Sequence, residues 1–158
     1  MPDYLFHFSE DPTIDLFVPR VAPTQQVEGA FVWADDETHS PRFWFPRDCP
    51  RATWWKKSDI TDRVHAIQSD WYDRFVACEL YAYRLDGSTF RKNPPGGGWI
   101  SEATLAPLDV QPVGPLLDRH RAAGIELRVV DDLKALWQEV VALPDIDFSG
   151  IRLRNLDS

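Results

Sequence analysis

The chain has 158 residues, a net charge of −8 at pH 7 and a hydrophobic fraction of 44%. This length predicts one domain, residues 1–158, with enough chain to bury its own core. The hydrophobic content excludes a disordered chain, and the acidic balance argues against general nucleic-acid binding, which needs a basic surface.

The N-terminus and the cysteines indicate where the protein works. The opening residues MPDYLFHF lack the basic region and long apolar run of a signal peptide, and no later stretch has the apolar length of a membrane span. Cys49 and Cys78 do not form a CxxC pair, so no zinc site is indicated. A disulfide between them remains an alternative, but we expect two free thiols. The chain is therefore expected to be cytoplasmic, without membrane association.

The first predicted strand, residues 4–10, carries the first candidate site residues. Its alternate positions are aromatic on one face, while His7 and Ser9 share the other face with Leu5. Pro12 fixes its own backbone and ends the strand. Two interpretations of His7 stay open: a buried histidine bonded to a backbone carbonyl, or a functional group with the Ser9 hydroxyl beside it.

The stretch from residue 30 to residue 92 predicts several short elements with one Pro-bounded segment among them. Residues 43–50, FWFPRDCP, could form a rigid structural corner or a ligand wall. His65 lies off the apolar stripe of its predicted helix and is expected to face solvent. The elements are strand 30–34, a helix within 37–45 that begins near Pro41, strand 52–55, an amphipathic helix or two short turns over 58–74, strand 74–85, and a hairpin return at 89–91 after the Asp86–Gly87 turn.

The second half of the chain predicts a loop followed by alternating strands and helices. The glycine-rich loop 93–98 could act as a lid or be only a long turn. Phe148, Ile151 and Leu153 are expected to be buried in the last strand. The elements are an edge strand within 105–113, a helix over 116–123 closed by Gly124, strand 125–130, a helix over 133–143 capped by Asp131 or Asp132, and strand 148–156.

This order of elements predicts the α+β class: a single domain with a split or largely antiparallel sheet and short helices. No GxGxxG follows a strand and no GxxxxGK[ST] occurs, so the two commonest phosphate-binding loops are excluded. Any nucleotide site must therefore be built in another way.

Over nearly its full length the chain resembles a small uncharacterised bacterial family. The shared motifs are His-Phe-Ser-Glu at residues 7–10, Phe-Pro-Arg-Asp-Cys-Pro at 45–50 and Phe-Ser-Gly-Ile-Arg at 148–152. This resemblance implies no activity.

Shorter motifs resemble the ADP-ribosyltransferase-like superfamily, in its histidine-first branch. Leu-Phe-His-Phe-Ser at residues 5–9 matches the first strand of that branch, and Val-Trp-Ala-Asp-Asp at 32–36 matches its second strand and acidic turn. Phe-Trp-Phe at 43–45 stands where the branch has an aromatic helix. Trp-Ile-Ser-Glu at 99–102 is similar to its glutamate motif. The resemblance implies an ADP-ribosyltransferase-like fold.

The resemblance also implies a role for each matching residue. His7 would bind a ribose hydroxyl of NAD with support from Ser9, and Trp33 would stack on nicotinamide. Glu102 would bond the 2′-hydroxyl of the nicotinamide ribose and stabilise an oxocarbenium-like transition state; Glu79 is its rival. The other expected cofactor contacts are Tyr81, as an aromatic wall, and Arg47, as one of four arginines that could reach the pyrophosphate (Arg42, Arg47, Arg152 and Arg154).

Three functions stay open at this point. The first is an enzyme, an NAD-dependent ADP-ribosyltransferase or NAD glycohydrolase, with NAD as substrate and no metal. The second is a non-catalytic module for a small ligand or nucleotide, with Trp33, Trp54, Trp55 and Tyr81 in its cleft. The third, a hydrolase or metal site from His7, Glu10, His39 and Asp48, lacks any recognised ligand spacing. The oligomeric state cannot be predicted.

Overall fold

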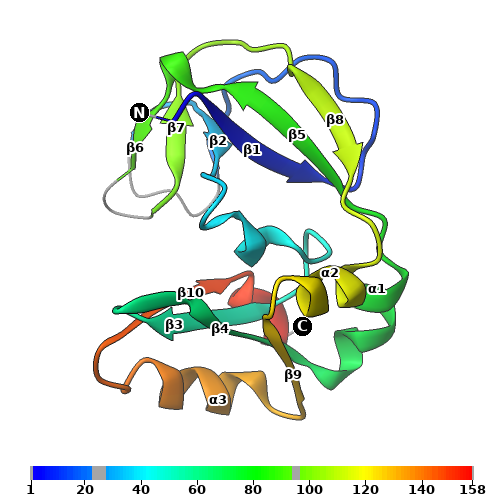
Figure 1. Cartoon of the computed structure of the whole chain (residues 1–158), viewed down its shortest axis with the longest axis vertical. Helices are drawn as coiled ribbons and strands as arrows, with labels where there is room; N and C mark the ends of the chain where they lie inside the picture. The colour runs from blue at the N-terminus through cyan, green and yellow to red at the C-terminus, as the bar shows by residue number, and fades with distance from the viewer. Residues whose placement is uncertain (1, 23–27, 94–96, 158) are drawn as a thin grey trace. The chain divides into compact units, whose positions relative to one another are not determined.

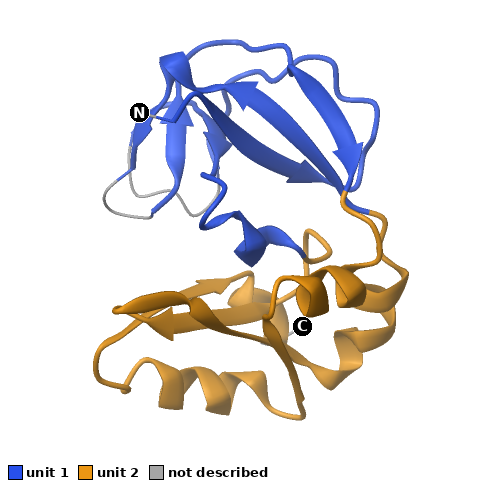
Figure 2. Ribbon diagram, viewed as in Figure 1, with its two compact units in different colours: residues 1–44, 80–112 blue, residues 45–79, 113–158 orange. Residues whose placement is uncertain are grey.

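The computed structural model describes residues 2–22, 28–93 and 97–157 (Figure 1). The predicted glycine-rich loop at 93–98 lies partly outside these ranges. By their contacts the residues divide into two compact units, each made of two chain segments (Figure 2). Unit 1 comprises residues 1–44 and 80–112, and unit 2 comprises residues 45–79 and 113–158.

Unit 1 contains two three-stranded antiparallel sheets with the strand orders β1-β5-β8 and β2-β7-β6. An isolated bridge joins them, because Phe6 and Asp35 exchange both backbone hydrogen bonds at 2.8 Å. The elements are β1 (Tyr4–Ser9), β2 (Val32–Ala34), the 3-10 helix η1 (Ser40–Phe43), β5 (Tyr81–Asp86), the 3-10 helix η3 (Gly87–Thr89), β6 (Arg91–Lys92), β7 (Trp99–Ser101) and β8 (Asp109–Pro112).

The core of unit 1 is formed by the face of β1 that carries Leu5 and His7. Leu5 lies opposite Leu85 and His7 opposite Tyr83, and Leu5, Leu85 and Tyr83 are fully buried. The aromatic rings of β1 line the other face, where Phe6 and Phe8 stack at 6.4 Å between ring centroids. The alternation predicted for this strand is therefore confirmed.

Unit 2 contains one four-stranded sheet with the order β10-β3-β4-β9, in which only the β4–β9 pair is parallel (Figure 1). Helix α3 packs on this sheet and buries Leu133 and Val140 against Ala52 and Trp54. The elements are β3 (Arg51–Lys56), β4 (Asp59–Gln68), the 3-10 helix η2 (Ser69–Trp71), α1 (Tyr72–Ala77), α2 (Leu116–Ala122), β9 (Glu126–Val130), α3 (Leu133–Val140), β10 (Ile146–Ile151) and the 3-10 helix η4 (Leu153–Asp157).

The amphipathic helix or two short turns predicted over residues 58–74 are wrong for most of this stretch, because residues 59–68 form the long strand β4. Both faces of β4 are covered: Val64 packs in the apolar cluster with α3, and Ile67, on the opposite face, is fully buried. The spacing of these two residues imitates a helical stripe. His65 was expected to face solvent, but it is only 1% exposed, because the rings of Phe45 and His120 pack against it.

Three further predictions need correction. The predicted strand 74–85 begins only at Tyr81, because Tyr72–Ala77 forms α1 with an aspartate in its first turn and an arginine in its last, as the helix dipole favours. The return strand after Asp86 pairs with β7 rather than with β5, since η3 turns the chain away. Phe148 is 45% exposed on the edge strand β10, where its ring packs at 84° to the Trp137 ring, 5.3 Å between centroids.

The predicted last strand 148–156 is also wrong in its second half. β10 ends at Ile151, Arg152 takes a positive φ of 58°, and the chain continues as η4. Ile151 and Leu153, expected to be buried, are half-buried.

Asp132 caps α3 as predicted, by accepting a hydrogen bond from the Ala135 amide at 3.0 Å, and Gly124 takes a positive φ of 71° after α2. The chain has an α+β fold with mostly antiparallel sheets and short helices, as expected. Among the described residues, no helix combines the length and apolar character that crossing a membrane requires. Cys49 and Cys78 are not joined in a disulfide.

Candidate functional site

The structure brings His7 and Trp33 together in unit 1. The Nδ1 atom of His7 lies 2.8 Å from the backbone oxygen of Trp33, and because a carbonyl can only accept, Nδ1 carries the proton. The His7 ring also packs edge-on against Phe17, 4.8 Å between centroids. His7 is half-buried. This is the carbonyl-bonded arrangement that the sequence left open as the structural interpretation.

The other residues implied in unit 1 lie around these two. Trp33 is half-buried, and its indole N–H is buried without a hydrogen-bond partner among the described residues. Ser9 lies opposite Tyr81 where β1 and β5 pair, and its hydroxyl accepts a hydrogen bond from the Asp11 amide at 3.1 Å. Glu102 is exposed directly after β7, the strand that pairs with β2.

The remaining expected residues lie in unit 2. Arg47 is exposed, and so is Glu79, the rival acidic residue, which lies between α1 and β5 rather than on a strand face. Trp54 and Trp55 are buried at 7% and 8% exposure in β3. Those two tryptophans therefore belong to the core instead of lining a ligand cleft.

Two acidic residues and a histidine form a hydrogen-bonded cluster where β2 ends. The possible ligand atoms of Asp35, Asp36 and His39 lie within 4.8 Å of one another. Each is already engaged: Arg42 Nε donates to Asp35 at 2.7 Å, and His39 Nδ1 lies 2.7 Å from Asp36, which also accepts from the indole N–H of Trp99. A guanidinium already neutralises the buried carboxylate, so this cluster holds η1 against β2 and β7.

The pKa values of the two aspartates reflect these contacts. Burial raises the pKa of Asp35, and the Arg42 guanidinium acts against that rise. For Asp36, burial also acts to raise the pKa, but the hydrogen bonds from His39 and Trp99 outweigh it and hold the pKa below its usual range. Asp36 is therefore ionised throughout the physiological range.

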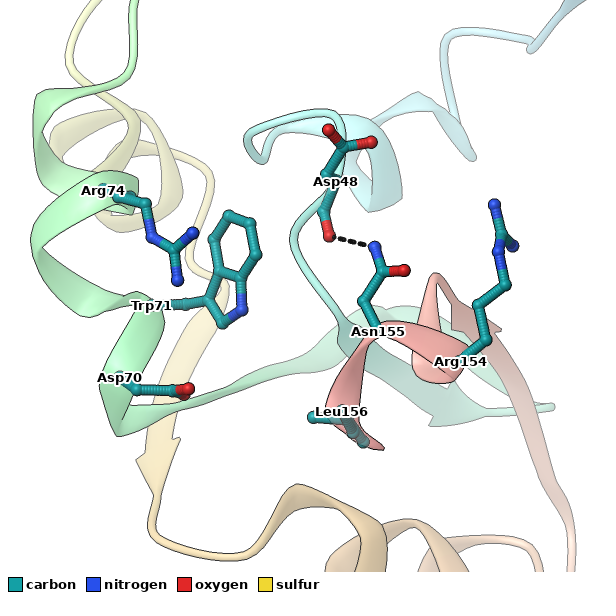
Figure 3. A pocket seen from close by; sticks show the side chains of 7 residues that line it. All are labelled: Asp48, Asp70, Trp71, Arg74, Arg154, Asn155 and Leu156. Carbon is teal, nitrogen blue, oxygen red and sulfur yellow. Dashed lines mark hydrogen bonds between the residues drawn. The ribbon is translucent and has the colours of Figure 1, made fainter. Parts of the chain in front are cut away.

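Unit 2 contains a pocket of about 610 Å³ that the sequence did not predict (Figure 3). Three segments form it: the turn before β3, the η2–α1 junction and the C-terminal 3-10 helix η4. Its volume falls within the range of roughly 300–1,000 Å³ that is usual for small-molecule sites. The lining residues are Asp48, Asp70, Trp71, Arg74, Arg154, Asn155 and Leu156.

Trp71 is the one large ring in this pocket. The guanidinium carbon of Arg74 lies 3.4 Å from the centroid of the indole, so the two planar groups are in direct contact. In Figure 3 the indole stands between Arg74 on one side and Asp48 and Asn155 on the other. The Asn155 amide donates to the backbone oxygen of Asp48 at 2.8 Å and so ties η4 to the turn before β3.

A pair of buried histidines also lies in unit 2, outside the pocket lining. His120 Nδ1 lies 2.8 Å from the Leu116 carbonyl oxygen, so it donates, and His120 Nε2 accepts from His65 Nδ1 at 2.8 Å. Phe45 packs against both histidine rings, and Phe75 packs against the His120 ring. Burial lowers the pKa of His120 to about 4 and lowers the pKa of His65 well below its usual value.

Sequence reasoning missed the pocket because its residues were assigned to other structures. Trp71 was placed on the apolar stripe of a helix that is a strand for most of its length, and Arg74 at the start of a strand. A signal was present in the i, i+3 spacing of Trp71 and Arg74, which places two side chains together on a helical turn.

Comparison with known proteins gives one match. A family model described as "Family of unknown function (DUF6886)" matches residues 6–156. The chain matches no curated protein and no solved structure. The match agrees with the resemblance to an uncharacterised family, and it assigns no ligand or activity.

Proposed function

We propose that this chain, which belongs to the family of unknown function DUF6886, is a small-ligand-binding module whose site is the unit 2 pocket. The observation that carries the proposal is the lining of that pocket. One aromatic ring, two arginines, two aspartates and an asparagine from separate chain segments converge on about 610 Å³. Such a site offers a stacking surface together with hydrogen-bond donors and acceptors that fix orientation.

The lining supports binding more than turnover. None of the described residues that line the pocket is a histidine, cysteine, serine or lysine, the groups most often used as nucleophile or general base at neutral pH. The two carboxylates, Asp48 and Asp70, are exposed to water. Water-exposed carboxylates are suited to accept hydrogen bonds from a ligand.

A second candidate is an NAD site in unit 1, which the resemblance to ADP-ribosyltransferases implies. Its support is proximity: two of the implied residues, His7 and Trp33, are joined by the 2.8 Å hydrogen bond from His7 Nδ1 to the Trp33 backbone oxygen. The Trp33 indole N–H, buried without a partner among the described residues, favours it too. In this candidate Glu102 supplies the acidic group, and Ser9 and Tyr81 complete the wall.

A metabolite screen by ligand-detected NMR on the full chain separates the two candidates. We expect compounds that bind the wild type to lose binding in Trp71→Leu and Arg154→Ala. The matched control is Arg121→Ala, which removes an exposed arginine in the last turn of α2 that does not line the pocket. If the ligands bind both pocket variants as they bind the wild type but no longer bind His7→Asn, the pocket is refuted and the NAD site is favoured.

A further inference from the structure

We infer that the unit 2 pocket takes a planar nitrogen heterocycle that bears amino donors and a single anionic group, as in a nucleoside monophosphate. This inference rests on the proposed function, since it names the ligand class of the same site. It follows from what each lining group can and cannot bind.

The first step is the stacking surface. Arg74 lies directly against the Trp71 ring at 3.4 Å, so one part of the indole surface is already covered by a planar cation. The indole is half-buried, and Asn155 stands on its other side in Figure 3. A planar base would stack on the part of the indole that Arg74 leaves uncovered, because every base offers a flat face to an aromatic side chain. The platform therefore selects a planar ring.

The second step is the anion. The Arg154 side chain is exposed at the pocket and makes no hydrogen bond or ion pair with the described residues. A guanidinium only donates, and its fork of N–H groups matches a carboxylate or phosphate. Arg74 keeps its in-plane N–H donors but is held with its face on the indole. We therefore assign the negative charge to Arg154, whose guanidinium is not held in this way.

The third step limits that charge and places the donors. Asp48 and Asp70 offset the two arginines, so the lining is neutral overall, and the whole chain carries a net charge of −8. A polyphosphate would meet two carboxylates and a negative protein, which disfavours it. The same carboxylates accept hydrogen bonds only, and exocyclic amino groups on a base are suitable donors. One anionic group and several N–H donors satisfy the whole lining.

Isothermal titration calorimetry with four probes tests this ligand class on the full chain. The probes are adenosine monophosphate, adenosine (ring without anion), ribose 5-phosphate (anion without ring) and adenosine triphosphate. We expect the monophosphate to bind at least about tenfold more tightly than each of the others, since a hydrogen bond to a charged group is worth roughly 1.5–3 kcal/mol.

The variants assign each part of the ligand to its residue. Arg154→Ala should weaken the monophosphate about tenfold and leave adenosine unchanged, whereas Trp71→Leu should weaken both. Asp70→Asn should raise the affinity for the triphosphate relative to the monophosphate, because it removes one repelling charge. Arg121→Ala should change none of these affinities.

Two results overturn the inference: a triphosphate or adenosine that binds as tightly as the monophosphate, or no binding by any probe at millimolar concentration. The proposed function fails separately. If the metabolite screen finds a ligand of another class whose binding needs Trp71 and Arg154, the pocket stands and only the inferred class falls. If every ligand found binds both variants as tightly as the wild type, the pocket is not the binding site.

Discussion

The paired histidines predict that the protein loses stability between pH 7.5 and pH 5. His65 and His120 are 1% and 0% exposed, and the hydrogen bonds require His120 to be neutral, because its Nδ1–H donates to Leu116 while its Nε2 accepts from His65. A proton added to His120 Nε2 would face the His65 N–H. The remaining nitrogen, His65 Nε2, is buried with no hydrogen-bond partner among the described residues.

The magnitude follows from the depressed pKa values. Burial lowers the pKa of His120 from 6.5 to about 4, so below pH 6.5 the unfolded chain binds a proton that the folded chain refuses. The contribution of neutral His120 to the free energy of unfolding is fully present above pH 6.5 and is lost as the pH falls toward 4. Since one pKa unit corresponds to about 1.4 kcal/mol, His120 alone removes about 2 kcal/mol by pH 5 and about 3 kcal/mol below pH 4. His65 acts in the same direction, because burial and the nearby charges of His120, Arg63 and Arg51 all oppose its protonation.

The assay is urea unfolding at half-unit pH intervals from 7.5 to 5, above the range in which carboxylates titrate. The double variant His65→Leu/His120→Leu removes both titrating rings together with the hydrogen bond between them, so its unfolding free energy should be nearly flat over this range. An NMR titration of the His120 ring in the wild type should give no midpoint above pH 5. A flat wild-type profile, or an equal slope in the double variant, would refute this reasoning.

Three further stability predictions concern single contacts, each measured as a change in the free energy of unfolding. Gly87→Ala should destabilise by about 1–3 kcal/mol, since its methyl group would collide with the Pro2 carbonyl oxygen; an unchanged midpoint would show that the turn adapts freely. Asp132→Ala should cost about 1 kcal/mol through loss of the α3 cap, whereas its neighbour variant Asp131→Ala should cost less. Arg42→Ala should cost about 3–5 kcal/mol, because it leaves the Asp35 carboxylate buried without its cation. The exposed ion pair of Lys56 and Asp62 supplies the comparison, and a similar loss in Lys56→Ala would argue against that explanation.

Local signals predicted those elements whose pattern lies within the element itself. Alternation predicted β1, the Asp132 cap marked the start of α3, and Gly124 marked the end of α2. β4 was missed because a strand covered on both faces shows no alternation, and its apolar residues imitated helical spacing. The groups that pack on those faces, α3 on one and His120 on the other, lie far from β4 in the sequence.

The candidate sites show the same limit. The motif around His7 and Trp33 could be read from the sequence, since each motif lies within one strand, and the structure places the two residues in contact. The unit 2 pocket could not be predicted from the sequence, because Asp48, Trp71 and Arg154 come from segments that are far apart in the chain and are brought together only by folding. His65 was misjudged for the same reason: its acceptor, His120, lies 55 residues away.

The most direct measurement of the central claim is the ¹H–¹⁵N spectrum of the tryptophan indole groups during titration with adenosine monophosphate. The chain has seven tryptophans, so single Trp→Phe variants assign the signals of Trp71 in the pocket and Trp33 in unit 1. Binding at the pocket predicts a saturable shift of the Trp71 signal with Trp33 unmoved, and loss of that shift in Arg154→Ala. A saturable shift of Trp33 with Trp71 unmoved would contradict the account and place the ligand in unit 1.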